Sequence, residues 1–212
     1  HCKGAGICSP YEMAIALGEN AVANGAALYL GEAVTGIEKQ GDAFLIQTPR
    51  RRLRGRFAVN CAGLHAAQVA RMAGPAAFDI HPRTGEYLLF VRGSGKILNS
   101  VVFQMPTPMG KGVLVTPTCY GNLLAGPDAI DEAGPVSRAT HAPRLLDIYR
   151  QARQTTDKLN IRQFLRSFAG VRAVATGDDF LLGESPVKGF FQAAGIQSPG
   201  LTAAPAIARE MV

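Results

Sequence analysis

The last stretch of the chain, GIQSPGLTAAPAIAREMV from Gly195 to Val212, is the most informative about the fold. It predicts the end of a strand, a turn at Ser198-Pro199-Gly200 and an amphipathic helix that opens at Thr202. A glycine just ahead of a helix lets a ligand approach the backbone, and the unpaired N–H groups at the positive end of the helix dipole then face that ligand. Such a turn suits an anion, or the edge of a ring that gains negative charge on reduction. The alternative is an ordinary strand-to-helix connection capped by Ser198 or Thr202.

A second strand, glycine turn and helix lie in the first half of the chain. The strand is expected over Arg54–Cys61, the turn at Asn60-Cys61-Ala62-Gly63, and the helix over Leu64–Ala73, where Gly74-Pro75 ends it. This is the layout of a βα ligand site.

The other expected elements place a β-rich block between these two turns. Ser9 and Pro10 begin a helix over Pro10–Asn24 with an apolar stripe. The expected strands are Ala27–Leu30, Ala33–Lys39, Ala43–Thr48, Gly85–Val91, Ser100–Gln104, Gly112–Pro117, Asn122–Ala125, Ile161–Phe168, Phe180–Gly183 and Phe190–Ala194, with a further helix over Ala142–Gln154. The order predicts one domain made of two separated segments, 1–76 and 184–212, with a second domain, 77–183, inserted between them.

Composition excludes several classes of protein. The chain has 212 residues, of which 47% are hydrophobic and 18% charged, which is enough for a packed core and too much aliphatic content for a disordered chain. Its 24 glycines and 13 prolines favour many turns over a helical bundle. No apolar run reaches the roughly 18 residues that span a bilayer, and no signal peptide is visible. The chain starts at His1 rather than Met, so we expect a piece of a longer protein.

Charge and cysteines indicate the kind of partner and compartment. The net charge is +6, and Arg50, Arg51, Arg52, Arg54 and Arg56 supply much of it. Alternation with Leu53 and Gly55 and the absence of aromatic residues among them favour the wet face of a strand over nucleic-acid binding. A positive surface suits a small anionic substrate. Four scattered cysteines without a zinc spacing predict a reducing compartment, hence the cytoplasm, and no metal site; a site made of His1, Cys2 and Cys8 is the weaker alternative.

Several motifs, in order along the chain, resemble the FAD-dependent oxidoreductases of the D-amino-acid-oxidase superfamily, especially the branch of glycerol-3-phosphate dehydrogenases and L-2-hydroxyglutarate oxidases. The motifs are NCAGLHA (60–66), PRTGEYLL (82–89), KGVLVTPT (111–118), GNLLAGP (121–127), FAGVRA (168–173) and GIQSPGLTAAP (195–205). The resemblance extends from about Ser9 to Val212.

The resemblance implies an α/β fold. A partial Rossmann-like FAD-binding domain, made of two chain segments, is joined to an inserted substrate domain with a mixed, largely antiparallel sheet. The family's GxGxxG motif and the acidic residue that binds the adenosine ribose are absent from this sequence. The chain as given is therefore expected not to hold FAD tightly and not to be active alone.

The resemblance also implies the site residues. Val34 is expected near the adenine, while Ala62 and Gly63 approach the FAD phosphates or ribose, where a Cβ would block the backbone. The amides of Gly200, Leu201 and Thr202 are expected at the pyrimidine edge of the flavin, where they stabilise charge at N1 and O2. The alternative for Val34 is plain strand core.

Three side chains are the candidates for the substrate. Arg172, after Ala169-Gly170-Val171, is expected to grip a carboxylate or phosphate, with a surface arginine as the alternative. The Tyr87 hydroxyl is expected to contact the substrate, unless it is a half-buried strand residue, and Glu86 points to the opposite face. His65 is the candidate base for the substrate hydroxyl, with a structural hydrogen bond as the alternative.

The sequence thus predicts part of a flavin oxidoreductase that oxidises a small anionic hydroxy compound, glycerol 3-phosphate or a 2-hydroxy acid, by hydride transfer to FAD. An amino-acid oxidase and a non-catalytic binding or subunit module without the cofactor half are the alternatives. The electron acceptor, and association with a membrane surface or a subunit, stay open.

Overall fold

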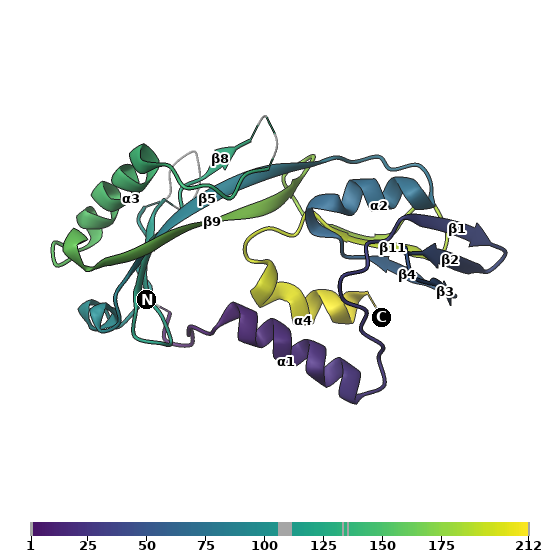
Figure 1. The fold of residues 1–212 in the computed structure, drawn as a ribbon, viewed down its shortest axis with the longest axis horizontal. Coiled ribbons are helices and arrows are strands. Elements are labelled where there is room, and N and C mark those ends of the chain that lie inside the picture. The colour runs from purple at the N-terminus through teal and green to yellow at the C-terminus, as the bar shows by residue number, and fades with distance from the viewer. Residues whose placement is uncertain (1, 106–111, 133, 135, 212) are drawn as a thin grey trace. The chain divides into compact units, whose positions relative to one another are not determined.

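The structure, a computed structural model, describes residues 2–105, 112–132, 134 and 136–211 (Figure 1). Of the positions singled out above, His1, Lys111 and Val212 lie outside them. The chain forms two compact units, each built from two segments: His1–Gly25 with Arg83–Val171, and Ala26–Pro82 with Arg172–Val212. We call them the first and the second unit. These bounds differ from the predicted ones, which assign 1–76 and 184–212 to a cofactor-binding domain and 77–183 to a substrate domain. That functional division stays a prediction.

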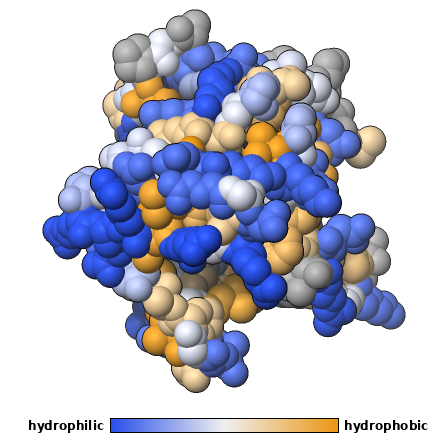
Figure 2. Space-filling view, turned by 90° about the vertical axis from the view of Figure 1, so that its right-hand side faces the viewer, coloured by the Kyte–Doolittle hydropathy of each residue, from blue (hydrophilic) through white to orange (hydrophobic). Residues whose placement is uncertain are grey.

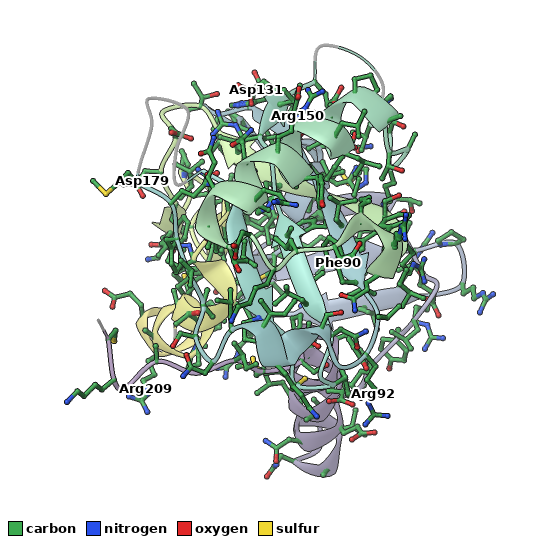
Figure 3. All side chains as sticks on the ribbon, turned by 90° about the vertical axis from the view of Figure 1, so that its left-hand side faces the viewer. Phe90, Arg92, Asp131, Arg150, Asp179 and Arg209 are labelled. Atoms are coloured by element: carbon green, nitrogen blue, oxygen red, sulfur yellow. The ribbon has the colours of Figure 1, made fainter. Side chains whose placement is uncertain are left out.

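The first unit is built on an antiparallel sheet covered by one helix. The strand order is β6-β7-β5-β8, and β9 pairs with β5. The strands are β5 (Ile80–Phe90), β6 (Leu114–Pro117), β7 (Leu123–Gly126), β8 (Ile130–Asp131) and β9 (Phe164–Ala175), and the helix is α3 (Ala142–Thr155). Leu88 and Phe90 alternate along β5 on the face that packs beneath α3, where Ile148 and Ala152 are fully buried. Figure 3 labels Phe90 inside this unit and Arg150 on the outer side of α3.

The second unit contains two small sheets. One is the antiparallel meander β1-β2-β3, made of β1 (Gly36–Gln40), β2 (Ala43–Gln47) and β3 (Arg52–Gly55). The other is β10-β11-β4, made of β4 (Ala58–Asn60), β10 (Leu181–Glu184) and β11 (Phe190–Ala194). Its helices are α2 (Ala66–Ala73) and α4 (Gly200–Glu210). Phe44 and Phe190, with ring centroids 5.9 Å apart, join the two sheets in one core with Ala58 and Ala70.

The parallel pairing of β4 with β11 is the feature of the second unit that matters most for function. Phe190, Phe191 and Gln192 lie opposite Ala58, Val59 and Asn60, although the two strands come from different ends of the chain. Parallel neighbours need a long crossover, and the crossover here passes through the first unit. The expected α/β class is confirmed, with the parallel pairing in the sheet β10-β11-β4 and antiparallel pairing of β5 with β7 and β8 and of β6 with β7.

Three expectations about single elements are wrong. Residues 27–30 form no strand, and Val34 precedes β1 because that strand begins only at Gly36. The expected strand over 54–61 breaks at Arg56-Phe57, since β3 pairs with β2 while the Ala58 amide bonds to the Gly189 carbonyl in another sheet. Of the expected strand over 100–104, one bridge remains, between residues 102 and 115.

Both predicted terminal helices form, with differences at their N-termini. α1 (Pro10–Ala23) follows Ser9, whose side chain makes no capping bond, and none of its residues is buried by the part of the chain that the structure describes. α4 begins at Gly200, two residues before Thr202, and its N-cap is Pro199, so neither Ser198 nor Thr202 caps it. The apolar stripe correctly predicted α1 as a helix, but not the exposure of its Ile15 and Leu17.

Candidate functional site: two glycine corners and a substrate face

Both glycine turns follow strands of the sheet β10-β11-β4, and both begin at the same edge of that sheet. β4 ends at Asn60 and β11 ends at Ala194, and their parallel pairing places the two carboxyl ends side by side (Figure 1). We call the turn at residues 60–63 the first corner and the turn at residues 195–202 the second corner. Ligands of open α/β sheets bind outside the carboxyl ends of the strands, which is where these corners lie.

Asn60 organises the first corner. Its side chain is 3% exposed; Nδ2 donates to the Ala66 carbonyl and to Gln192 Oε1, both at 2.8 Å, and Oδ1 accepts from the Ala62 amide at 3.2 Å. One buried amide therefore ties the turn, the start of α2 and β11 together. The sequence does not reveal this role directly, although a polar residue at a strand end beside a glycine turn is a usable signal.

Gly63 supplies the backbone shape of the first corner. Its φ is +57°, a left-handed conformation that favours glycine, and no atom lies within 4 Å of the position a Cβ would occupy. The turn is therefore bounded by open space rather than by packed side chains. A ligand can approach the backbone here without displacing a neighbour.

The second corner presents a helix N-terminus. The Gly200 amide donates to the Gln197 carbonyl at 2.6 Å, so it is already occupied. The amides of Leu201 and Thr202 lie in the first turn of α4, where helix geometry provides no carbonyl partner, and both residues are exposed. Two of the three amides predicted at this corner thus remain available to an electron-rich group.

The residues of the two corners fit a dinucleotide. A left-handed glycine with open space and a helix N-terminus with unused amides, at one carboxyl edge, match the needs of a phosphate and of a ring edge that gains charge. Val34 lies ahead of β1 and is half-buried. Among the described residues, no group of three or more His, Cys, Asp or Glu side chains could hold a metal ion.

Cys61 lies in the first corner, and His65 lies just after that corner. Burial raises the pKa of the Cys61 thiol above its ordinary value, which disfavours the thiolate. His65 is exposed in the short 3-10 turn that leads into α2, and its amide donates to the Ala62 carbonyl at 3.0 Å. Its side chain makes no capping bond at the start of α2.

Tyr87 and Arg172 are both half-buried on long strands, in different units. Tyr87 lies on β5 and stacks on Phe168 of β9, with ring centroids 5.0 Å apart and planes 10° apart. Arg172 lies in the last part of β9, which belongs to the second unit.

Glu86 points to the opposite face of β5, as expected, into a buried network of charges. It is 0% exposed; its carboxylate accepts from His141 Nδ1 at 2.7 Å, from the His141 amide at 3.0 Å and from Arg144 at 3.2 Å. Arg144 binds Asp128 in a bidentate pair at 2.6 and 2.8 Å, and Asp128 also accepts the Glu86 amide at 2.7 Å. The hydrogen bond with Asp128, against the opposing effect of burial, raises the pKa of Arg144 above its ordinary value.

The family model for the FAD-dependent oxidoreductases, DAO, matches residues 1–212. The chain belongs to this family. A glycerol 3-phosphate dehydrogenase of Caloramator mitchellensis is 42% identical over 208 residues, which cover 98% of this chain and 43% of that protein. A glycerol 3-phosphate oxidase of Mycoplasma pneumoniae is 37% identical over 190 residues, covering 84% of this chain and 48% of that protein.

Solved structures agree with this assignment. The L-alpha-glycerophosphate oxidase of Mycoplasma pneumoniae with FAD bound matches the DAO-family chain with a TM-score of 0.84 at 32% identity, over 92% of this chain and 53% of that chain. A glycine oxidase from Geobacillus kaustophilus matches with a TM-score of 0.81 at 24% identity, which shows the shared fold alone. The chain spans about half the length of these relatives. No helix among the described residues is long and apolar enough to cross a membrane.

Proposed function

We propose that the DAO-family protein containing this chain oxidises the alcohol carbon of a small anionic hydroxy compound, glycerol 3-phosphate or a 2-hydroxy acid. The observation that carries this proposal is the arrangement of the two glycine corners at the shared carboxyl edge of β4 and β11. FAD, when bound, supplies the hydride acceptor. The relatives named as glycerol 3-phosphate dehydrogenase and oxidase support the choice of substrate class.

In this proposal the two corners bind the cofactor. The Ala62-Gly63 backbone holds the phosphates or ribose, because the left-handed Gly63 carries no Cβ to block the approach. The Leu201 and Thr202 amides at the start of α4, with Gly200 turning the backbone, stabilise negative charge at the pyrimidine edge of the flavin. Val34 contacts the adenine through its backbone.

In this proposal three side chains bind the substrate or accept its hydroxyl proton. Arg172 binds the anionic group with two parallel N–H donors, and the Tyr87 hydroxyl contributes a hydrogen bond. His65 accepts the hydroxyl proton on a ring nitrogen when the alcohol is oxidised. The chain's net charge of +6 attracts anions toward the protein.

The test uses the full open reading frame that contains this chain. The purified protein should be yellow, and anaerobic glycerol 3-phosphate or an L-2-hydroxy acid should bleach its flavin absorbance. Bleaching by glycine or proline instead would favour the amino-acid oxidase alternative. A protein that binds no flavin would favour the non-catalytic module and overturn the proposal.

For partners and location we propose a small anionic substrate, no nucleic acid and a cytoplasmic protein. Arg52 and Arg54 are exposed on β3, an edge strand, where charge discourages pairing with other chains. Figure 2 shows a face on which hydrophilic residues predominate and smaller hydrophobic areas lie between them. Flotation of the full protein with vesicles of anionic and of neutral lipid, at low and high salt, tests the association with a membrane surface that the sequence leaves open.

A further inference from the structure

The ring of Tyr87 is held on one side by Phe168. The two rings stack nearly parallel, 5.0 Å apart between centroids, across the pairing of β5 with β9 in the first unit. Phe168 is 37% exposed, so it contributes less to the core than a buried phenylalanine would. It stacks on Tyr87, and offset or parallel stacking restricts the orientation of both rings.

Gly126 leaves the space that the Tyr87 ring occupies. Gly126 follows Ala125, which pairs with Leu88, so it lies beside Tyr87 on the neighbouring strand β7. A Cβ at Gly126 would lie 2.9 Å from Tyr87 Cδ1 and 2.7 Å from the Glu86 carbonyl oxygen, both closer than real side chains approach. Its φ of +134° is a second reason for glycine at this position.

The backbone of Tyr87 is fixed from the opposite face of the strand. The preceding residue, Glu86, is held by its carboxylate to His141 and Arg144 and by its amide to Asp128. With the Cα fixed by this network and the ring confined by Phe168 and Gly126, few orientations remain for the phenol. The direction of its hydroxyl is therefore set before a ligand arrives.

We propose that Phe168 is a positioning residue that sets the direction of the Tyr87 hydroxyl for binding the substrate anion. This proposal rests on the proposed function, because it concerns the substrate side chain assigned there. Phe168 acts only through Tyr87, so its removal should cost affinity when the Tyr87 hydroxyl is present and nothing further when that hydroxyl is absent. Gly126 acts in the same way from the other side of the ring.

The experiment measures steady-state kinetics of the full-length holoenzyme with glycerol 3-phosphate for wild type, F168A, F168Y, Y87F and the double variant F168A/Y87F. F168A should raise KM about three- to tenfold with little change in kcat, and F168Y, which keeps the stacked ring, should retain the wild-type KM. The KM of the double variant should equal that of Y87F alone. L165A is the matched control, since Leu165 is a 54% exposed apolar residue of the same strand, and its KM should not change.

Any one of four results would overturn the inference. If the effects of F168A and Y87F on KM multiply, or if L165A raises KM as much as F168A, Phe168 acts on the strand in general and not through Tyr87. If F168A fails to fold, F168L, which keeps bulk without a ring plane, replaces it, and an unchanged KM in F168L would count equally against the proposal. An unchanged KM in Y87F with intact flavin bleaching would refute this inference and leave the proposed function standing.

Discussion

The buried network around Glu86 makes a quantitative stability prediction for Arg144→Met. The variant removes a guanidinium that lies 2.6 and 2.8 Å from the Asp128 oxygens and 3.2 Å from Glu86. The side chains of Arg144, Asp128 and Glu86 are 20%, 17% and 0% exposed. Water therefore cannot fully solvate the two carboxylates that lose their cationic partner. Removing one partner of a buried ion pair typically costs 3–5 kcal/mol, and we expect about 3 kcal/mol here because His141 still binds Glu86 at 2.7 Å.

The matched control is Arg150→Met on the same helix. Arg150 pairs with Asp147 at 2.9 Å, but the two side chains are 73% and 63% exposed, and such surface pairs contribute at most about 0.5 kcal/mol. The assay is urea unfolding of the full-length protein, followed by far-UV circular dichroism, with hydrogen exchange of α3 to localise the change. If Arg144→Met and Arg150→Met lose the same small stability, the network does not hold β5 in the way argued above.

The first corner makes three further predictions. Gly63→Ala should cost about 1–2 kcal/mol and weaken FAD binding in the full-length protein, whereas Gly25→Ala, at φ +93° with equally open surroundings, should cost stability without changing flavin affinity in a flavin titration. Asn60→Ala, which removes the three hydrogen bonds of that side chain, should lower the free energy of unfolding by about 2 kcal/mol in a urea titration, and a loss under 0.5 kcal/mol would contradict its role. Because burial raises the pKa of the Cys61 thiol, less of it is thiolate at pH 8, so iodoacetamide should label it more slowly than a cysteine in a free peptide, with the rate rising as the pH is raised. Bound FAD should slow the labelling of Cys61 further but leave Cys119 unaffected, although both cysteines are exposed, as mass spectrometry of the two peptides can show.

Much of the local structure could be predicted because local patterns determine it. The neighbouring expected strands over Ala33–Lys39 and Ala43–Thr48 form β1 and β2, which join in a hairpin with Gly41 at φ +62°, since alternation on both sides and a glycine turn define a hairpin over a few residues. β11 has the predicted bounds, and α1 and α3 differ by one residue at one end, because an apolar period and a breaker mark each of them.

The wrong predictions concern which strands pair with one another, and this pairing depends on residues far apart in the sequence. Apolar and aromatic side chains at Leu28, Tyr29 and Leu30 suggested a strand, but no described strand pairs with these residues. The Tyr29 ring instead lies under the Arg51 guanidinium, whose Cζ is 3.9 Å from the ring centroid. The residues around Arg56 read as one continuous strand because nothing local shows that the chain passes from one sheet to another there.

The candidate site divides in the same way. Motifs along the chain identified the glycines of both corners, because a left-handed turn or a close backbone approach demands that residue type locally. They did not identify Asn60 as the residue that ties the first corner to β11, or Phe168 and Gly126 as the neighbours of Tyr87, since each of these contacts joins strands far apart in the sequence.

By itself the amino-acid sequence determined the residue types that local backbone chemistry requires: the turns, the helix starts and the glycines that a ligand can approach. Only the tertiary structure decided that β4 and β11 lie parallel and share one edge, and which side chains surround Tyr87. The reason is physical: a turn is defined by torsion angles within a few residues, whereas the alignment of two strands depends on hydrogen bonds and burial contributed by both ends of the chain.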